Sequence, residues 1–180
     1  MDAELDRVLA DDFLAKIADL PIAGLRELRT QCQSVETQLS YLRRMVQGRH
    51  DIVTGELGRR RLGGDRDDVA DLVEHLPEIL ADRIHAPGPG RLPSSMEPGE
   101  VSGRLAARLS EITDRVPIES PGAADDGALA EAATELSELE HEVSGFRRQL
   151  FDLIDALQAE ITRRYRDGEA QVDDVLSGGS

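Results

Sequence analysis

Polar residues with the chemistry to hold a nucleotide recur in two segments of the chain at helical spacing. The first set is Glu36, Ser40, Arg43, Gln47 and Asp51, and the second is Glu140, Ser144, Arg147 and Asp155, with the aromatic Phe151 at the position equivalent to Gln47. An arginine fork matches phosphate oxygens or the O6 and N7 of guanine, and its plane stacks on bases. A carboxylate accepts two parallel N–H bonds, which guanine offers at N1 and N2. The two stripes therefore predict a site for a ligand with paired phosphates and hydrogen-bonding base edges.

Both stripes lie on segments whose apolar residues alternate three and four positions apart, the pattern of a coiled-coil seam. The a positions are Leu25, Cys32, Leu39, Val46 and Val53 in the first segment and Leu129, Leu136, Val143, Leu150 and Leu157 in the second. The d positions are Leu28, Val35, Leu42, Ala132, Leu139, Phe146 and Leu153. Two long helices are therefore predicted, and the two stripes occupy the same e, b and f positions in both.

Two helices of one chain joined by a connection normally pack antiparallel, so position numbers that face each other have a nearly constant sum. This pairing places Leu42 near Leu150 and Val46 near Phe146. On the e flank the expected neighbours are Glu36 and Asp155, Ser40 and Phe151, Arg43 and Arg147, Gln47 and Ser144, and Asp51 and Glu140. A coiled coil built only for stability places opposite charges there, so facing like charges favour a bound ligand. The approximate two-fold axis of such a hairpin suits a two-fold symmetric dinucleotide.

The predicted fold class is all-α: an antiparallel two-helix coiled-coil hairpin, with a short N-terminal helix and a long Pro/Gly-rich connection. We expect an amphipathic helix in 1–20, the first coiled-coil helix in 21–62, and the second in 127–167. Residues 63–126 are expected to be a partly flexible connection with short helices, and 168–180 a disordered acidic tail. Pro21 is expected to start the first long helix, and the glycines at 63 and 168 to close the two.

Composition narrows the class of protein. A formal net charge of −15 at pH 7 argues against binding nucleic acid or an anionic membrane, and favours a basic protein partner. The lone Cys32 excludes an internal disulfide, and no signal region or membrane-length apolar run is seen, so a cytoplasmic protein is expected. The histidines lack metal-ligand spacing, and no phosphate-binding loop or nucleophile with a neighbouring base is present. We therefore predict a protein that binds no metal and is not an enzyme.

The pattern of the first stripe resembles the signature of the RsiG-type actinobacterial anti-sigma factors. That family binds cyclic di-GMP on an antiparallel coiled coil and then sequesters the sporulation sigma factor WhiG. The resemblance implies the same ligand and a WhiG-type sigma factor partner here, with all ten stripe residues as ligand-binding residues. The second stripe departs from the pattern at Phe151, where the family has Gln.

Two other interpretations stay open. One stripe taken alone is more often a solvated charged face than a binding site. The alternative function is a structural coiled-coil adaptor without nucleotide binding. A titration with the dinucleotide distinguishes the two functions, because only the sensor should bind it.

Overall fold

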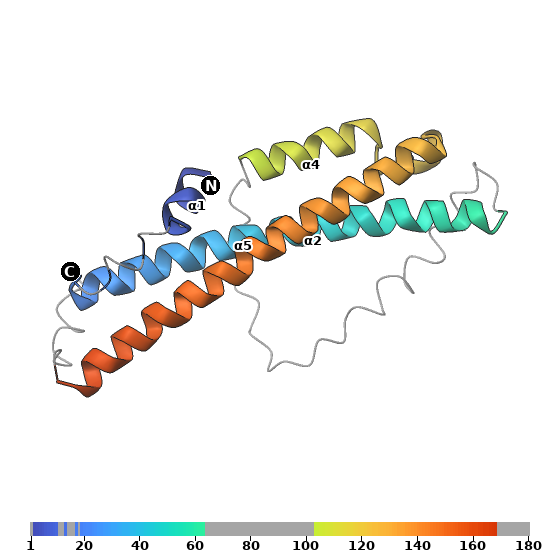
Figure 1. The fold of residues 1–180 in the computed structure, drawn as a ribbon. Helices are drawn as coiled ribbons and strands as arrows, with labels where there is room; N and C mark the ends of the chain where they lie inside the picture. The colour runs from blue at the N-terminus through green and yellow to red at the C-terminus, as the bar shows by residue number, and fades with distance from the viewer. Residues whose placement is uncertain (1, 11–12, 14–16, 18, 64–102, 169–180) are drawn as a thin grey trace. The chain divides into compact units, whose positions relative to one another are not determined.

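The computed structural model describes residues 2–10, 13, 17, 19–63 and 103–168, and every regular element among them is a helix. It comprises α1 (Asp2–Val8), α2 (Ile22–Arg61), α4 (Arg104–Arg115), a 3-10 turn η2 (Pro121–Ala123) and α5 (Asp126–Arg166), all visible in Figure 1. The all-α prediction is confirmed for these residues. Residues 64–102 of the connection lie outside them, with any short helix expected there, as do residues 169–180 of the tail.

The long helices begin and end where local chemistry requires it. Pro21 directly precedes α2, and its carbonyl accepts a hydrogen bond from the amide of Leu25. Proline is favoured at a helix start because the backbone N–H that it lacks would have no partner within the helix. After each long helix the chain turns at a glycine with positive φ, 85° at Gly63 and 73° at Gly168. Basic residues fill both last turns, where they face the negative end of the helix dipole.

The N-terminal helix is much shorter than the predicted segment 1–20. It ends at Val8, and Phe13 then closes a turn by donating its amide to the carbonyl of Ala10. Further along, the carbonyls of Ile17 and Leu20 accept hydrogen bonds from the guanidinium of Arg164. These contacts tie Ile17 and Leu20 to the C-terminal end of α5.

The chain divides into two compact units, and each is described by itself. The first unit consists of Met1–Ser40 and Ser144–Ser180, and so holds α1, the first part of α2 and the last part of α5. Here the two long helices run antiparallel, since Arg26 contacts Tyr165 and Glu36 contacts Arg147. Arg7 of α1 donates to Gln31 of α2 across 2.9 Å, which ties the short helix to the first long one.

The second unit, Tyr41–Val143, holds the last part of α2, α4, η2 and the first part of α5. Its long helices are again antiparallel, because Arg43 contacts Glu140 and Arg60 contacts Asp126. Helix α4 buries its apolar side chains almost completely and contacts α5 through arginines. The two units therefore share one plan, in which a short helix accompanies two antiparallel long ones.

The predicted apolar positions form the core of both units. Every predicted a residue is buried, and Cys32 is among them with a pKa raised by desolvation, as expected of a core thiol. Of the predicted d residues, Leu28, Phe146 and Leu153 are only half-buried. Coiled-coil packing of knobs into holes stays a prediction.

A charged cluster closes the end of α2 inside the second unit. Glu56 occupies a d position and is only 2% exposed, where the seam pattern would place an apolar residue. It accepts hydrogen bonds of 2.9 Å from Arg59 and 2.6 Å from Arg60. Arg60 also contacts Asp126 at 2.5 Å and donates to the carbonyls of the chain entering α5, including Ala124 at 2.9 Å. This cluster, here called the α2 clamp, fixes the end of α2 to the start of α5.

The same arrangement recurs in the first unit, at the end of α5. Glu160 accepts from Arg163 at 2.9 Å and from Arg164 at 2.7 Å, and Arg164 binds the carbonyls of Ile17 and Leu20 ahead of α2. We call it the α5 clamp. The residues of the two clamps are separated along the chain by the same distance as the two stripes. Even the carbonyls correspond, since Pro121 and Ala124 occupy the positions equivalent to Ile17 and Leu20. The chain is therefore an internal duplication.

The α5 clamp predicts a specific loss of stability in acid. Hydrogen bonds from Arg163 and Arg164 lower the pKa of Glu160 from 4.5 to about 2. A carboxyl whose pKa is lowered by folding stabilises the fold above its unfolded value and loses this contribution as the pH falls through its folded value. The melting temperature of the parent should therefore fall more steeply between pH 4.5 and about 2 than that of Glu160→Gln. Thermal unfolding by circular dichroism measures both slopes, and equal slopes would contradict the assignment.

Candidate ligand-binding site

The first unit holds half of the predicted site on the facing sides of α2 and α5. Arg147 donates to Glu36 Oε1 from Nη2 at 2.9 Å and from Nε at 3.2 Å. Ser40 Oγ donates to the same carboxylate oxygen at 2.6 Å, which orients Glu36 from one turn away. The side chains of Glu36 and Arg147 are 15% and 20% exposed, so the ion pair is shielded but reachable from solvent.

Phe151 lies beside this ion pair. The guanidinium carbon of Arg147 is 5.4 Å from the centroid of the Phe151 ring, within the range of a cation–π interaction. The ring is 40% exposed, which is unusual for a large apolar side chain in this structure. Arg147 is thus held between a carboxylate and an aromatic face, and part of that face is open to a stacking partner.

The second unit holds the corresponding half. Arg43 Nε donates to Glu140 Oε1 at 2.7 Å, and Gln47 Nε2 donates to the same oxygen at 3.2 Å. The side chains of Arg43 and Glu140 are 35% and 21% exposed. Gln47 therefore performs here a polar role that Phe151, its equivalent in the other stripe, cannot perform.

Each remaining stripe residue lies three or four positions along the helix from one of the residues described above. Asp51 is 15% exposed and lies 3.9 Å from the imidazole of His50 in the second unit. In the first unit, Ser144 is half-buried and Asp155 is exposed. Among the residues that the structure describes, no group of acidic residues, histidine and cysteine could hold a metal ion.

The predicted opposition of like charges is wrong. Arg43 was expected to face Arg147, but it pairs with Glu140, seven residues earlier on α5. Glu36 was expected near Asp155, but it pairs with Arg147. In each unit the arginine thus reaches a glutamate of the opposite helix, so opposite charges meet where like charges were expected. Each unit therefore contains one ion pair made from the glutamate of one stripe and the arginine of the other.

The sequence reasoning missed Glu56 and the two clamps. A signal was present, because the segments at 56–60 and 160–164 both read Glu, two residues, Arg, Arg, at the separation of the stripes. Extending the comparison of the two stripes toward the C-terminal ends of the helices would have found them.

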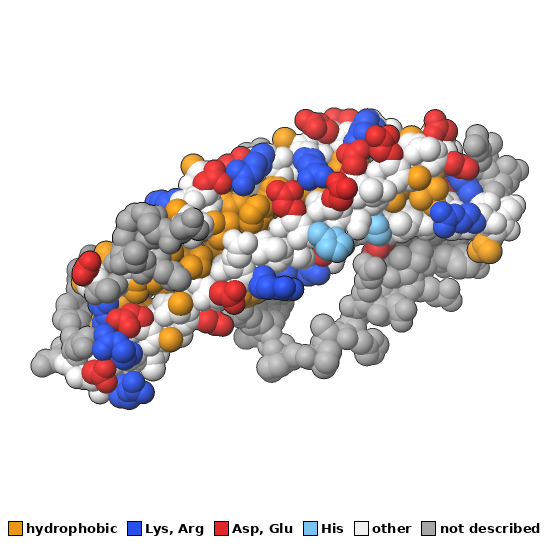
Figure 2. Space-filling model, in the orientation of Figure 1, with side chains coloured by type: hydrophobic (Ala, Val, Ile, Leu, Met, Phe, Trp, Pro, Cys, Tyr) orange, Lys and Arg blue, Asp and Glu red, His pale blue; other side chains and the backbone are white. Residues whose placement is uncertain are grey.

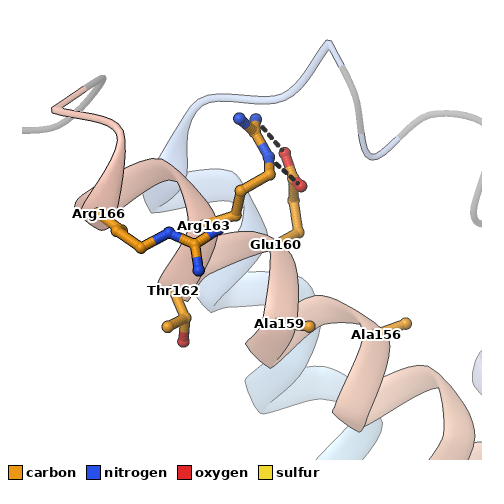
Figure 3. Close-up of a pocket in the computed structure, with 6 residues that line it drawn as sticks. All are labelled: Ala156, Ala159, Glu160, Thr162, Arg163 and Arg166. Atoms are coloured by element: carbon orange, nitrogen blue, oxygen red, sulfur yellow. Dashed lines mark hydrogen bonds and ion pairs between the residues drawn. The ribbon is translucent and has the colours of Figure 1, made fainter.

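A shallow depression of about 570 Å³ lies on α5 near its C-terminal end, and none of the ten stripe residues lines it. Figure 3 shows Glu160 and Arg163 side by side at its edge, joined by the ion pair of the α5 clamp, with Ala156 and Ala159 along the helix. Glu160 and Arg163 are engaged in the clamp, and Arg166 is 77% exposed and contacts Asp167, so the depression does not contain the chemistry predicted from the stripes.

The model of the RsiG-like family matches residues 11–80 and 116–178, and these residues include both stripes and both clamps. The chain belongs to the RsiG-like family. The resemblance noted from the stripes is thus confirmed over most of the chain, and membership indicates an anti-sigma factor role with a sigma factor as partner. A search of curated proteins finds no match.

The two parts of the RsiG-like match begin at nearly equivalent positions of the two repeats, residues 11 and 116. The match starts after α1 in the first repeat and immediately after α4 in the second, so both short helices lie outside it. The match thus covers both long helices, the segments that enter them, and residues beyond their C-terminal ends, up to 80 and 178. Among the described helices, even the two long ones are too polar to span a bilayer.

Proposed function

We propose that this protein is an anti-sigma factor that binds cyclic di-GMP through its two stripes and, when loaded, sequesters a WhiG-type sporulation sigma factor. The observation that carries the proposal is the pair of ion pairs, Glu36 with Arg147 and Glu140 with Arg43. Each joins an arginine suited to phosphate with a carboxylate suited to the guanine edge, and membership of the RsiG-like family supports the same ligand.

Ligand binding would proceed as an exchange of partners. A phosphate would take the arginine fork from its glutamate, and guanine N1–H and N2–H would donate to the carboxylate that the arginine leaves. After the exchange the arginine is paired with phosphate and the glutamate with guanine, so the new contacts compensate for the ion pairs that are lost. The entropy cost of ordering the side chains on binding is lower than for two arginines that repel each other, because the free protein already holds each side chain in an ordered position.

The duplication supports a two-fold symmetric ligand. The two ion pairs are interchanged when one repeat is mapped onto the other, and the clamps follow the same rule. A cyclic dinucleotide presents two identical halves, each with one phosphate and one base. An antiparallel coiled coil of α2 and α5 is the proposed frame that holds the two sets of groups.

The proposed partner is recognised partly by charge. The nucleic-acid-binding faces of a sigma factor are basic, and a chain of net charge −15 complements them. The protein we propose is cytoplasmic and acts on transcription through the sigma factor, without binding nucleic acid itself. The alternative, a structural adaptor, requires no nucleotide.

Calorimetric titration of the full chain with cyclic di-GMP tests the ligand. Saturable binding is expected, and linear pGpG is the control because it carries the same bases and an additional charge without the ring. No heat with cyclic di-GMP would favour the adaptor, and equal affinity for both compounds would contradict recognition of the cyclic ligand.

Phe151 should make the two halves unequal. Gln47 offers amide hydrogen bonds, whereas Phe151 offers only a face for stacking. Gln47→Ala should therefore weaken cyclic di-GMP binding by about tenfold, the effect of one hydrogen bond of roughly 1.4 kcal/mol. Phe151→Gln, which restores the family pattern, should weaken it less or tighten it. The same titration measures both variants, and a larger loss with Phe151→Gln would show that stacking dominates in the first unit.

A further inference from the structure

Helix α4 has the character of a docked basic amphipathic helix. Its apolar residues Leu105, Leu109 and Ile112, followed by Val116, are only 2–3% exposed and recur on one face. Its arginines Arg108 and Arg115 stand one heptad apart, so they project along one side of the helix. The helix starts at Gly103 without a side-chain cap.

The two arginines contact a ladder of acidic residues on α5. Arg108 pairs with Glu138 at 3.2 Å and with Glu142 at 3.1 Å. Arg115 pairs with Glu135 at 2.5 Å and with Glu131 at 3.9 Å. Figure 2 shows acidic and basic side chains gathered over this part of the second unit. We call these four glutamates the acidic ladder.

The acidic ladder is a feature of one repeat only. The equivalent positions on α2 carry Glu27, Gln31, Ser34 and Gln38, which include a single acidic residue. There the short helix α1 contacts α2 through the hydrogen bond from Arg7 to Gln31. The duplicated plan therefore needs a short helix beside each long one, but it does not need an Arg–Glu ladder to hold it.

The ion pairs of α4 are of the exchangeable kind. The side chains of Arg108 and Arg115 are 36% and 50% exposed, and those of the four ladder glutamates range from 27% at Glu135 to 68% at Glu131. Exposed pairs add little stability and re-form readily with another cation, whereas the clamp arginine Arg60 is only 7% exposed. The family match does not include residues 81–115, and α4 lies among them.

We propose that the α5 face beneath α4 is a docking surface for a basic amphipathic helix of the sigma factor, and that α4 occupies this surface in the free protein. The proposal rests on the proposed anti-sigma function. Charge complementarity carries it, because α4 shows which partner the face accepts: a helix with an apolar stripe and cations one heptad apart. Partner and α4 then compete for the acidic ladder.

Two double charge reversals distinguish competition from a merely structural role of α4. If α4 and the sigma factor compete, one reversal should tighten capture of the sigma factor and the other should weaken it. Arg108→Glu with Arg115→Glu weakens α4 docking and leaves the ladder free, so capture of a WhiG-type sigma factor should tighten about tenfold. Glu138→Arg with Glu142→Arg destroys the ladder, so capture should weaken by at least the same factor. Arg7→Glu with Arg166→Glu reverses two charges in the first unit and should change capture little.

Hydrogen exchange gives the second measurement. On adding the sigma factor to the parent chain loaded with cyclic di-GMP, amides of residues 104–115 should lose protection while those of the α2 clamp keep theirs. Loss of capture in both reversal variants, or α4 amides that keep their protection in the complex, would overturn the proposal. A parent chain that binds no sigma factor would instead overturn the proposed function, and that result is read from the parent alone.

Discussion

Replacing Arg43 and Arg147 together by alanine is expected to abolish cyclic di-GMP binding. Each arginine would make charge-assisted hydrogen bonds to phosphate, worth about 1.5–3 kcal/mol apiece. Losing one such bond in each half removes roughly 3–6 kcal/mol, which is about a 10²–10⁴-fold loss of affinity. Nucleotide-dependent capture of the sigma factor should be lost with it, because the two binding events are linked.

The chain offers a matched control for this experiment. Arg44 and Arg148 follow the two site arginines directly, occupy equivalent positions in the two repeats and are exposed. Arg44→Ala with Arg148→Ala removes the same charge and should leave binding within a few-fold of the parent. Both double variants should keep helical circular dichroism, because the e positions lie outside the buried seam. Undiminished binding in a folded Arg43, Arg147 variant would show that the stripes are only a charged surface.

Arg60→Ala is expected to destabilise the fold strongly. It removes the contact with Asp126 and the hydrogen bonds to the chain before α5, and it leaves the buried Glu56 with Arg59 alone. Breaking one partner out of a buried ion pair costs about 3–5 kcal/mol. For a chain of this size that corresponds to a fall in Tm of roughly 6–20 °C.

The neighbouring Arg61 is exposed at the end of the same helix and supplies the control. Arg61→Ala should shift Tm by no more than about 2 °C, since exposed charges contribute within about 0.5 kcal/mol. Arg164→Ala should behave like Arg60→Ala, because it performs the equivalent role for the carbonyls of Ile17 and Leu20. Thermal melts of the four proteins measure this, and an Arg60→Ala melt that overlays the parent would show that the α2 clamp is not a stabilising device.

Much of the fold could be read from the sequence because helix periodicity is a local signal. The apolar steps from Leu25 to Val53 and from Leu129 to Leu157 predict two long helices, and those residues are buried. Pro21, Gly63 and Gly168 mark the ends because each has a backbone preference that acts without tertiary contacts. The segment after Val8 could not be read in this way, since Arg164, far away in sequence, determines where its carbonyls point.

The relative register of α2 and α5 could not be read with equal accuracy. A heptad seam repeats itself, so a shift of seven residues pairs apolar positions with apolar positions as before. The apolar pattern alone therefore does not fix which charged residues meet, and in the structure Glu36 and Glu140 pair with the arginines of the opposite stripe. The ten residues were therefore identified from their types and spacing, whereas their partners depended on the electrostatics of the e flank.

The central claim is that cyclic di-GMP controls capture of the sigma factor. The most direct measurement is the affinity of the full chain for a WhiG-type sigma factor, determined by titration with and without saturating cyclic di-GMP. We expect the nucleotide to tighten the complex, and the sigma factor to tighten nucleotide binding by the same factor, because coupling between two sites is reciprocal. Equal affinity for the sigma factor in the presence and absence of cyclic di-GMP would contradict the account.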